Sequence, residues 1–318
     1  MSITLDGFPE AVLRQDGKEY MMGIDEAGRG PTLGPMVYGS AFCAVEDEER
    51  VKKMGFMDSK QLTEAKREQL WAELQQCGFI GWSIRVLEAK EISAGMLRRD
   101  APYNLNAQSH DAAIGLVRKV MERGVNLRYL TVDTVGDPER YQAKLEGIFP
   151  TLRIIVAKKA DALYPIVSAG SICAKVPRDT LLSCWRFEDP AFTDVDWGCG
   201  YPSDVNTKRW MKDNLDPVFG WPNICRFSWG PATEVPWARY RGDIKREMSN
   251  PSPSPNQVLE KNPQDHGVHV VRWADDAEDP AQAKQRQQMA QFLGAAKKQK
   301  VDRHSLLASA MLEPVEAW

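Results

Sequence analysis

The sequence predicts a mixed α/β fold, in which one β-sheet is flanked by helices. Short runs of apolar and β-branched residues alternate along the chain with longer segments in which apolar residues recur every three or four positions. Strands interleaved with helices in this way are typical of α/β domains, whose functional loops lie at strand ends. Acidic residues follow several of the apolar runs, so the pattern that predicts the fold also indicates where its chemistry lies.

Five segments are predicted to be strands because they are short, apolar and rich in β-branched residues. Glycines and prolines separate the first two and predict a turn between strands that lie side by side. The predicted strands are residues 20–24, 35–45, 79–87, 127–132 and 153–157.

Four segments are predicted to be helices from their apolar periodicity and their end signals. Residues 104–123 place their apolar side chains on one stripe and end at Gly124, a typical helix C-cap. Residues 63–76 end just before Gly78, and residues 203–215 begin at Ser203, a favourable N-cap. The fourth, 165–185, contains a run of Ala, Gly and Ser that permits close approach to a neighbouring element or to nucleic acid.

The composition changes after about Glu247, which divides the chain into residues 1–247, with a helical C-terminal part, and residues 248–318. The segment 249–256 is rich in Pro and Ser and is predicted to be a linker, because it offers little to pack into a core. Beyond it, 268–273 is compatible with a strand and 281–296 with a helix rich in Gln and Ala. A disordered tail is an equally acceptable interpretation of this polar segment.

Acidic residues stand at three predicted strand ends: Asp25 and Glu26, then Asp133, then Asp161 just beyond residue 157. Each acid alone is compatible with a turn or a helix cap. Together they are more than turns usually supply, and a Gly-Arg-Gly turn follows the first pair. Neighbouring strand residues point to opposite faces, so Asp25 and Glu26 share a site only if the backbone bends or if they address different sides of a metal cluster.

Several other chemistries are disfavoured. His110 is the only histidine before residue 249, which argues against Ser-His-Asp, Cys-His and histidine-rich zinc sites, and His110 itself is expected to pack or to form hydrogen bonds. The turn from Gly28 to Gly34 lacks the Lys-Ser/Thr ending of a P-loop and has Leu33 where a dinucleotide fingerprint needs glycine. Nucleoside triphosphates and NAD are therefore not expected.

Seven motifs follow one another along the chain: Asp25-Glu26-Ala27-Gly28-Arg29-Gly30, Asp58-Ser59-Lys60, Tyr103-Asn104-Leu105-Asn106, Val132-Asp133-Thr134-Val135-Gly136, Lys159-Ala160-Asp161-Ala162-Leu163-Tyr164-Pro165, residues 168–175, and Gly200-Tyr201-Pro202-Ser203-Asp204. Their identity and order resemble type 2 ribonucleases H, in particular the catalytic (A) subunits of the eukaryotic form. The resemblance covers about residues 19–230 without a large gap.

The resemblance implies an RNase H-like fold that hydrolyses RNA in RNA/DNA hybrids and cuts 5′ of single ribonucleotides in duplex DNA, leaving 3′-hydroxyl and 5′-phosphate ends. It implies a role in removing ribonucleotides and RNA primers during DNA replication and repair. Carried over by position, it implies four catalytic, metal-binding acids: Asp25, Glu26, Asp133 and Asp161. It further implies that Gly28, Arg29 and Gly30 sense the ribose 2′-hydroxyl, that Tyr201 stacks at the ribonucleotide-deoxyribonucleotide junction, and that Lys60, Asn104 and Lys175 bind substrate.

Metal ions are expected because four neighbouring carboxylates resist joint ionisation unless cations bind between them. Two Mg²⁺ ions about 4 Å apart meet this need, one activating the attacking water and the other stabilising the leaving 3′-oxygen. Mn²⁺ is expected to substitute, because oxygen ligands suit both metals. A side chain on Gly28 or Gly30 is expected to obstruct backbone reading of the 2′-hydroxyl.

The net charge of −3 includes the site acids, and the distribution of charge is more informative than the sum. Residues 151–246 carry 14 Lys and Arg against 11 Asp and Glu, a balance that suits phosphate contacts with a duplex. The basic residues expected on this surface are Lys158, Lys159, Lys175, Arg178, Lys208, Arg209, Lys212 and Arg226.

The sequence has no stretch of 18 apolar residues and no basic-then-apolar leader, so we expect a soluble protein that is not secreted. Its six cysteines lack a C-x-x-C pair and are expected to be reduced thiols. The resemblance implies a nuclear location, and otherwise a cytoplasmic one. It also implies that the tail docks two accessory subunits in a heterotrimer, although bacterial and archaeal relatives act alone.

Two interpretations from other classes remain open. A non-catalytic nucleic-acid-binding or scaffold subunit would keep a basic surface and a tail but would need none of the four acids. A metal nuclease with another substrate, such as a four-way junction resolvase, would need the acids alone. The presence of all four acids argues against the scaffold subunit. Tyr201 and the Gly28-Arg29-Gly30 turn argue against the resolvase.

Overall fold

The computed structural model describes residues 3–14, 17–56, 62–98, 101, 103–134, 136–187, 196–216 and 219–233. The chain divides into two compact units, of which the first comprises residues 1–213 and 222–233. In the described part of the second unit, residues 214–216 and 219–221, Asp216 and Gly220 exchange backbone hydrogen bonds. The linker and tail predicted at 248–318 lie outside the described residues.

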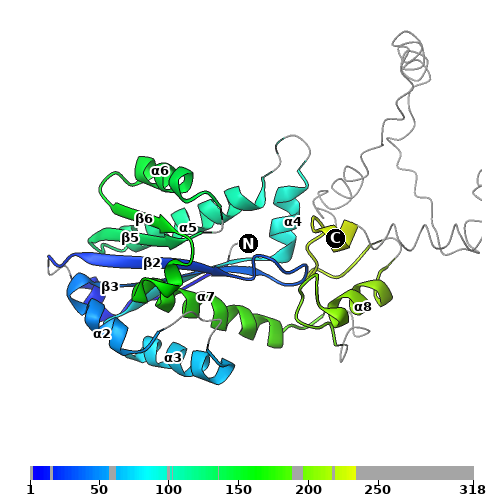
Figure 1. Ribbon diagram of the computed structural model, residues 1–318, viewed down its shortest axis with the longest axis horizontal. Helices are drawn as coiled ribbons and strands as arrows, with labels where there is room; N and C mark the ends of the chain where they lie inside the picture. Colours follow the sequence, from blue (N-terminus) through cyan, green and yellow to red (C-terminus); the bar gives the residue numbers. More distant parts are fainter. Residues whose placement is uncertain are drawn as a thin grey trace, which may run out of the picture. The chain divides into compact units, whose positions relative to one another are not determined.

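The first unit is built on a six-stranded mixed sheet with the order β1-β4-β3-β2-β5-β6 (Figure 1). β2 pairs with β5 and β5 with β6 in parallel, whereas the pairs β2·β3, β3·β4 and β4·β1 are antiparallel. The strands are β1 (Ile3–Gly7), β2 (Tyr20–Ala27), β3 (Met36–Ala44), β4 (Gly81–Leu87), β5 (Leu127–Asp133) and β6 (Arg153–Ala157). All five predicted strands are present, and β1 is an edge strand that the sequence analysis did not predict.

One face of the sheet is covered by the long helix α7 (Pro165–Ser183), with α3 (Glu64–Gln76) and α2 (Glu48–Lys53) packed beside it. A buried apolar cluster joins Ile172 of α7 and Leu70 of α3 to Ile84 of the sheet. Glycines on both sides allow very close packing of α7 on the sheet: a Cβ on Gly170 of α7 would lie 2.9 Å from the Gly23 carbonyl oxygen, and one on Gly39 of β3 would lie 2.3 Å from the Ala174 nitrogen. The small residues therefore serve contact with β2 and β3.

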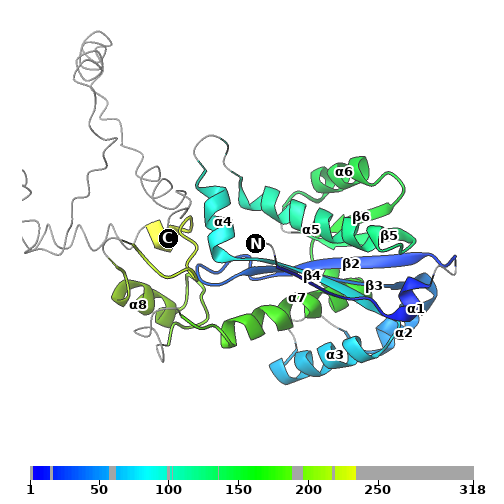
Figure 2. The same cartoon turned by 180° about the vertical axis from the view of Figure 1, so that it is seen from behind.

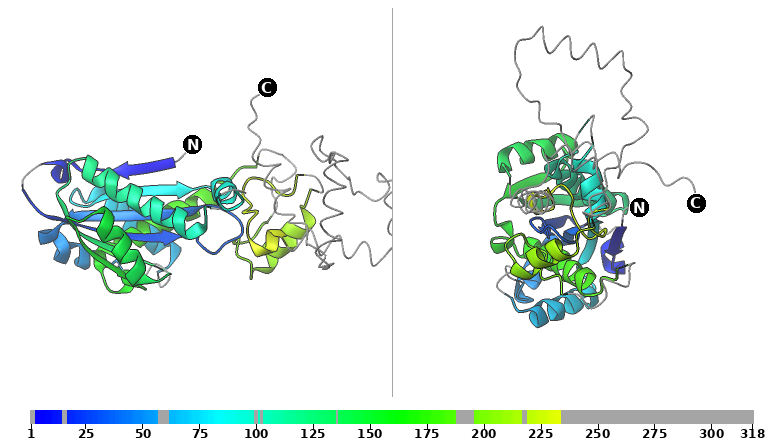
Figure 3. Two further views of the ribbon diagram at one scale, coloured as in Figure 1. Left: turned by 90° about the horizontal axis from the view of Figure 1, so that it is seen from above. Right: turned by 90° about the vertical axis from the view of Figure 1, so that its right-hand side faces the viewer.

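The opposite face is covered by α5 (Leu105–Glu122) and α6 (Pro138–Ile148), and α4 (Ala89–Met96) contacts α5 (Figure 2). A second buried cluster includes Leu116 and Val117 of α5, Leu145 of α6, and Phe42 and Leu130 of the sheet. The end-on view in Figure 3 shows helices on both sides of the sheet. α6 was not predicted, although Asp137 caps its N-terminus and Pro138 occupies its first turn, both standard start signals.

Shorter elements complete the unit: α1 (Glu10–Leu13), η1 (Val45–Asp47), η2 (Ala160–Ala162) and α8 (Val205–Asp213). The N-cap predicted for α8 at Ser203 is wrong. Asp204 accepts a hydrogen bond from the Thr207 amide at 3.1 Å, and an ionised carboxylate next to a helix N-terminus is a stronger acceptor than a hydroxyl.

All six cysteines are free thiols, and Cys43, Cys173 and Cys225 are buried. Among the described residues, no helix combines the length and the apolar composition needed to span a membrane.

Candidate active site

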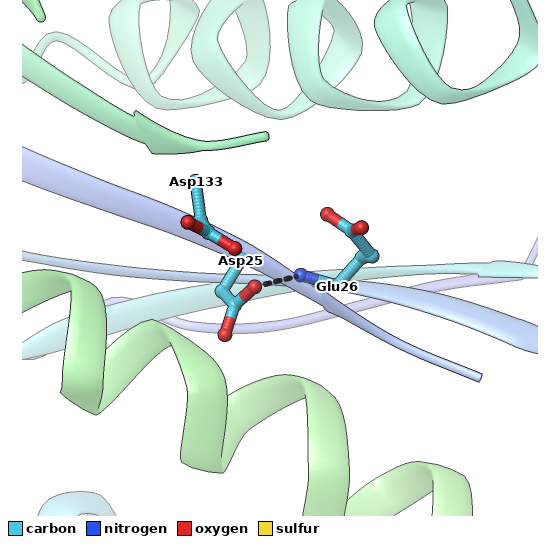
Figure 4. A group of neighbouring side chains, drawn as sticks. All are labelled: Asp25, Glu26 and Asp133. Atoms are coloured by element: carbon cyan, nitrogen blue, oxygen red, sulfur yellow. Dashed lines mark hydrogen bonds between the residues drawn. The ribbon is translucent and has the colours of Figure 1, made fainter. Parts of the chain in front are cut away.

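Three acidic side chains meet at the centre of the sheet (Figure 4). Asp25 and Glu26 belong to β2, and Asp133 is the last residue of β5. β2 and β5 are parallel neighbours with Ile24 opposite Val132, so the next residue of each strand, Asp25 and Asp133, also lies at one level of the sheet. One carboxylate oxygen from each acid lies within 4.8 Å of the others.

Asp25 and Glu26 lie inside β2, and not beyond its end as the sequence predicted. Pairing with β3 continues through Asp25 opposite Gly39 and Glu26 opposite Tyr38. Of the two arrangements that the sequence allowed, the structure has the second: the side chains of Asp25 and Glu26 leave β2 in different directions and still approach one another (Figure 4). Continuous pairing holds the backbone straight, so the two carboxylates flank the site from different sides.

Asp25 is the most buried of the three, with 6% of its surface exposed. One of its oxygens accepts a hydrogen bond from the Glu26 amide at 2.7 Å, and Ser171 of α7 bonds the same side chain. Burial raises the pKa of Asp25 well above its usual range, and the charges of Glu26 and Asp133 raise it further. A buried carboxylate beside two other acids is stabilised by a cation, and oxygen donors suit hard divalent ions. The donor set therefore fits divalent metal ions.

Asp161 lies next to this group but is not one of its three members. It is buried on η2, which directly follows β6, and the amide of the preceding Ala160 donates to Asp133 at 2.8 Å. Lys159 takes a left-handed conformation with φ of 59°, which turns the chain from β6 into η2. The structure thus brings three of the four predicted acids together. The fourth, Asp161, follows Ala160, whose amide is hydrogen-bonded to Asp133.

A cleft of about 550 Å³ opens beside the acids and extends over α5 and α6. His110 lies on its wall, where its ring stacks on Tyr141 with centroids 3.8 Å apart. Burial, with the charges of Lys144 and Arg29, lowers the pKa of His110 to about 4, so its ring is neutral at physiological pH. His110 packs as expected and is not part of the acidic group. Other wall residues are Glu26, Arg29, Asn104, Asn106, Asp133 and Arg140.

The Gly28-Arg29-Gly30 turn borders the same site and has little conformational freedom. Gly28 has φ of 79°, and a Cβ there would lie 2.6 Å from the Pro35 carbonyl oxygen, so only glycine fits. The guanidinium of Arg29 donates to Ser109 at 2.8 Å and to Asn106 at 2.5 Å, which ties the turn to α5. The side chain of Arg29 is thus held by the protein itself.

Tyr201 lies over this turn, with its ring carbon Cε1 3.5 Å from the position of a Cβ on Gly30. Its own loop is firmly held: Gly200 has φ of 82°, its amide donates to Thr207 at 2.9 Å, and its carbonyl accepts from Thr32 at 2.8 Å. The ring of Tyr201 is 40% exposed. A fixed, exposed aromatic ring against the turn that follows the acids offers a stacking surface.

The remaining predicted site residues have different surroundings. The Asn104 side chain caps α5 by accepting from the Ala107 amide at 2.9 Å, and it also lines the cleft. Lys175 contacts Asp179 at 3.0 Å. Lys60 lies outside the described residues.

The prediction that Arg178 and Arg226 belong to a phosphate-binding surface is wrong. They are 5% and 0% exposed, because Arg178 of α7 packs against Gly28 in the turn after β2 and Arg226 bonds the carbonyl of the same glycine. Residue type cannot distinguish a buried arginine from an exposed one, and the buried role of Arg226 was therefore missed.

Comparison with known proteins agrees with this arrangement. The family model described as Ribonuclease HII matches residues 22–232. The A subunit of ribonuclease H2 from Homo sapiens is 48% identical over 216 residues, covering 68% of this chain and 72% of that protein. Its counterpart from Schizosaccharomyces pombe is 47% identical over 222 residues, covering 68% of this chain and 67% of that protein.

Among solved structures, the crystal structure of ribonuclease H2 from Pyrococcus horikoshii superposes with a TM-score of 0.56 at 31% identity. The match covers 70% of this chain and 99% of that one.

Proposed function

Because this chain belongs to the ribonuclease HII family and is a ribonuclease H hydrolase, we propose that it hydrolyses the RNA strand of RNA/DNA hybrids and cuts 5′ of single ribonucleotides embedded in duplex DNA. The observation that supports this most is the position of the acidic group beside the Gly28–Gly30 turn and Tyr201. One side of the site is suited to phosphodiester hydrolysis, and the other to recognition of a sugar.

Asp25, Glu26 and Asp133, with Asp161 completing the set, are the residues that would hold two Mg²⁺ ions in the catalytic state, and Mn²⁺ would substitute. When bound, such ions lower the pKa of the attacking water and stabilise charge on the leaving 3′-oxygen, so the products carry 3′-hydroxyl and 5′-phosphate ends. The protein's part is to hold the carboxylates rigidly. Strand pairing fixes Asp25 and Glu26, and the Ala160 amide fixes Asp133.

The Gly28-Arg29-Gly30 turn would read the 2′-hydroxyl through its backbone, because that hydroxyl is the group that distinguishes ribose from deoxyribose. Gly30 is exposed and adds no Cβ between the backbone and a sugar. Tyr201 would then stack at the junction between the ribonucleotide and the following deoxyribonucleotide. Duplex binding would rest on basic side chains that remain at the surface, among them Arg140 of the cleft and Lys208 and Arg209 of α8.

We assign the chain by the same reasoning to removal of ribonucleotides and RNA primers during DNA replication and repair, in the nucleus. The homologues are named as A subunits, which implies further subunits. Residues 248–318 would dock two accessory subunits in a heterotrimer, separately from the chemistry of residues 1–247.

The two alternative functions, a scaffold protein and a junction resolvase, would need different structural features. A scaffold protein needs no buried group of acids, and burying Asp25 beside Glu26 and Asp133 without a cation is unfavourable. A junction resolvase needs neither a glycine turn open to a sugar nor an aromatic ring above it. The buried acids therefore favour the ribonuclease over a scaffold protein, and the glycine turn with Tyr201 favours it over a resolvase.

The deciding experiment uses the purified chain, with and without accessory subunits, on a DNA duplex that carries one ribonucleotide in the presence of Mg²⁺. We expect a single cut 5′ of the ribonucleotide with a 3′-hydroxyl end. An all-DNA duplex of the same sequence and a four-way junction are the controls. Cleavage of either control at a comparable rate, or no cleavage of the ribonucleotide duplex in any assembly, contradicts the proposal.

A further inference from the structure

Three consecutive carbonyl groups of the turn after β2 accept hydrogen bonds from one distant segment. Arg226 donates to the Gly28 carbonyl at 2.5 Å and to the Arg29 carbonyl at 2.9 Å. The indole nitrogen of Trp229 donates to the Gly30 carbonyl at 3.1 Å. The third nitrogen of the Arg226 guanidinium, Nε, donates to the Gly34 carbonyl at 2.9 Å, so the guanidinium joins both ends of the turn.

The segment that carries these donors is itself attached to the turn. The Arg226 amide donates to the Thr32 carbonyl at 2.8 Å, and the Gly34 amide donates to the Ile224 carbonyl at 2.7 Å. Leu33 and Cys225 form a β-bridge between these bonds. Arg226 and Trp229 therefore lie on a segment whose backbone is hydrogen-bonded to the chain that follows the turn.

A fully buried arginine is costly unless every donor direction is used. Arg226 is 0% exposed, its guanidinium lies 4.8 Å from the centroid of the Trp229 ring, and its bonds go to carbonyl oxygens. Burial and the nearby charge of Arg178 lower the pKa of Arg226 to about 9, which leaves it protonated at neutral pH. Donors on a cation bind carbonyl oxygens more strongly than neutral donors do.

The orientation of the carbonyls determines the orientation of the amides. In a planar trans peptide the C=O and the N–H of the same unit point in opposite directions. Holding the Gly28 and Arg29 carbonyls toward Arg226 therefore turns the amides of Arg29 and Gly30 away from it. Pro31 follows Gly30 and has no N–H, so the turn presents two such donors.

We propose that Arg226 and Trp229 are positioning residues for sugar recognition: Arg226 aims the amides of Arg29 and Gly30 at the ribose by holding the carbonyls of the same peptide units, and Trp229 fixes the end of the turn by holding the Gly30 carbonyl. The inference rests on the proposed reading of the 2′-hydroxyl by this turn. A merely structural role would affect binding of ribonucleotide and deoxyribonucleotide duplexes equally. The positioning role predicts a selective loss of discrimination between them.

The test compares dissociation constants for two duplexes of one sequence, one with a single ribonucleotide and one all-DNA, with Ca²⁺ replacing Mg²⁺ to limit cleavage. Trp229→Phe keeps an aromatic ring beside Arg226 and removes the donor to Gly30. Arg226→Lys keeps the charge and loses the planar fork. Trp71→Phe, at a partly buried tryptophan of α3, is the matched control.

We expect Trp229→Phe to reduce the ratio of the two dissociation constants about five-fold, the size of one hydrogen bond, and Arg226→Lys to reduce it more. Affinity for the all-DNA duplex and the ratio for Trp71→Phe should stay within about two-fold of wild type. If Arg226→Lys does not fold, Trp229→Phe decides. If the wild-type protein binds the two duplexes with nearly equal dissociation constants, the turn does not read the 2′-hydroxyl. If the wild-type ratio is large and folded Trp229→Phe, together with any folded Arg226→Lys, keeps that ratio, only the positioning role is overturned.

Discussion

Tyr201 lies against Gly30: a Cβ added to this glycine would be 3.5 Å from the ring carbon Cε1 of the tyrosine. The two residues are 171 positions apart in the sequence, yet the Gly200 carbonyl accepts hydrogen bonds from the amides of both Thr32 and Leu33. The Gly28-Arg29-Gly30 turn and Tyr201 are thus held together as one structure, as the proposed recognition of the ribose and its neighbouring nucleotide requires.

Tyr201→Ala should impair cutting at a single embedded ribonucleotide more than cutting of a long RNA/DNA hybrid, where many positions are available. Tyr201 is 40% exposed, so its loss should leave the melting temperature nearly unchanged. The measurement is kcat/KM on the two substrates, with Tyr201→Phe as the control that retains the ring. Equal losses on both substrates at an unchanged melting temperature would argue for a role other than junction recognition.

Gly28→Ala and Gly30→Ala should have different effects: the first should reduce both stability and activity, and the second only activity. The Cβ of Gly28→Ala would lie 2.6 Å from a backbone oxygen at a φ of 79°, so this variant should lose about 1–3 kcal/mol of stability together with activity. A Cβ at Gly30 meets only ordinary contact with Tyr201, so Gly30→Ala should fold normally and lose cleavage of the ribonucleotide duplex. Thermal unfolding and cleavage assays check both. Full activity of Gly30→Ala would show that the turn does not approach the sugar closely.

Asp133→Asn should lower turnover by orders of magnitude while duplex binding largely survives, because the lost charge acts on the transition state. The asparagine oxygen can still accept from the Ala160 amide, so the fold should be kept. Asp161→Asn tests the fourth acid, which lies outside the group of three. Turnover and duplex affinity are measured in Mg²⁺, and normal activity in either variant would remove that residue from the site.

The stability of the metal-free protein should depend on the ionisation of Asp25. Its pKa in the folded chain is raised above the unfolded value of 3.8, so the folded state binds more protons just above that pH. The free energy of unfolding should therefore fall as the pH rises from about 3.8 through the folded pKa of Asp25.

Asp25→Asn should remove this dependence, make the metal-free protein more stable at neutral pH, and abolish most of the stabilisation by added Mg²⁺. The measurement is chemical unfolding against pH, with and without EDTA, with Asp179→Asn as a control for an acid outside the metal-binding group. A metal-free Asp25→Asn protein less stable than wild type at pH 7 would contradict the argument.

Truncation near Glu247 should leave a folded, metal-binding catalytic part that no longer co-purifies with accessory subunits. The described core of the first unit uses residues before 234, so no core contact in that set is lost. Co-purification and the mass of the assembled complex are the measurements. A truncated chain that still assembles normally would place the docking surface on the catalytic part.

Local pattern was sufficient to predict most of the secondary structure. Residues 153–157 form β6 as predicted, and the predicted helix 104–123 differs from α5 only by its capping residues. A period of two or of 3.6 residues, with a glycine or a cap at the end, is a property of neighbouring residues and is visible without the fold. The same holds for the four acids, which motif order singled out.

Tertiary structure decided which of these residues meet and which are buried. Parallel pairing of β2 with β5 brings Asp133 to Asp25, and β2 extends past the predicted strand end because β3 continues to pair with it. Arg226 looked like a surface cation, yet its bonds reach Gly28 and Arg29, 198 and 197 positions earlier in the chain. Burial depends on such long-range contacts, so no local pattern could reveal that this arginine supports the turn beside the acids.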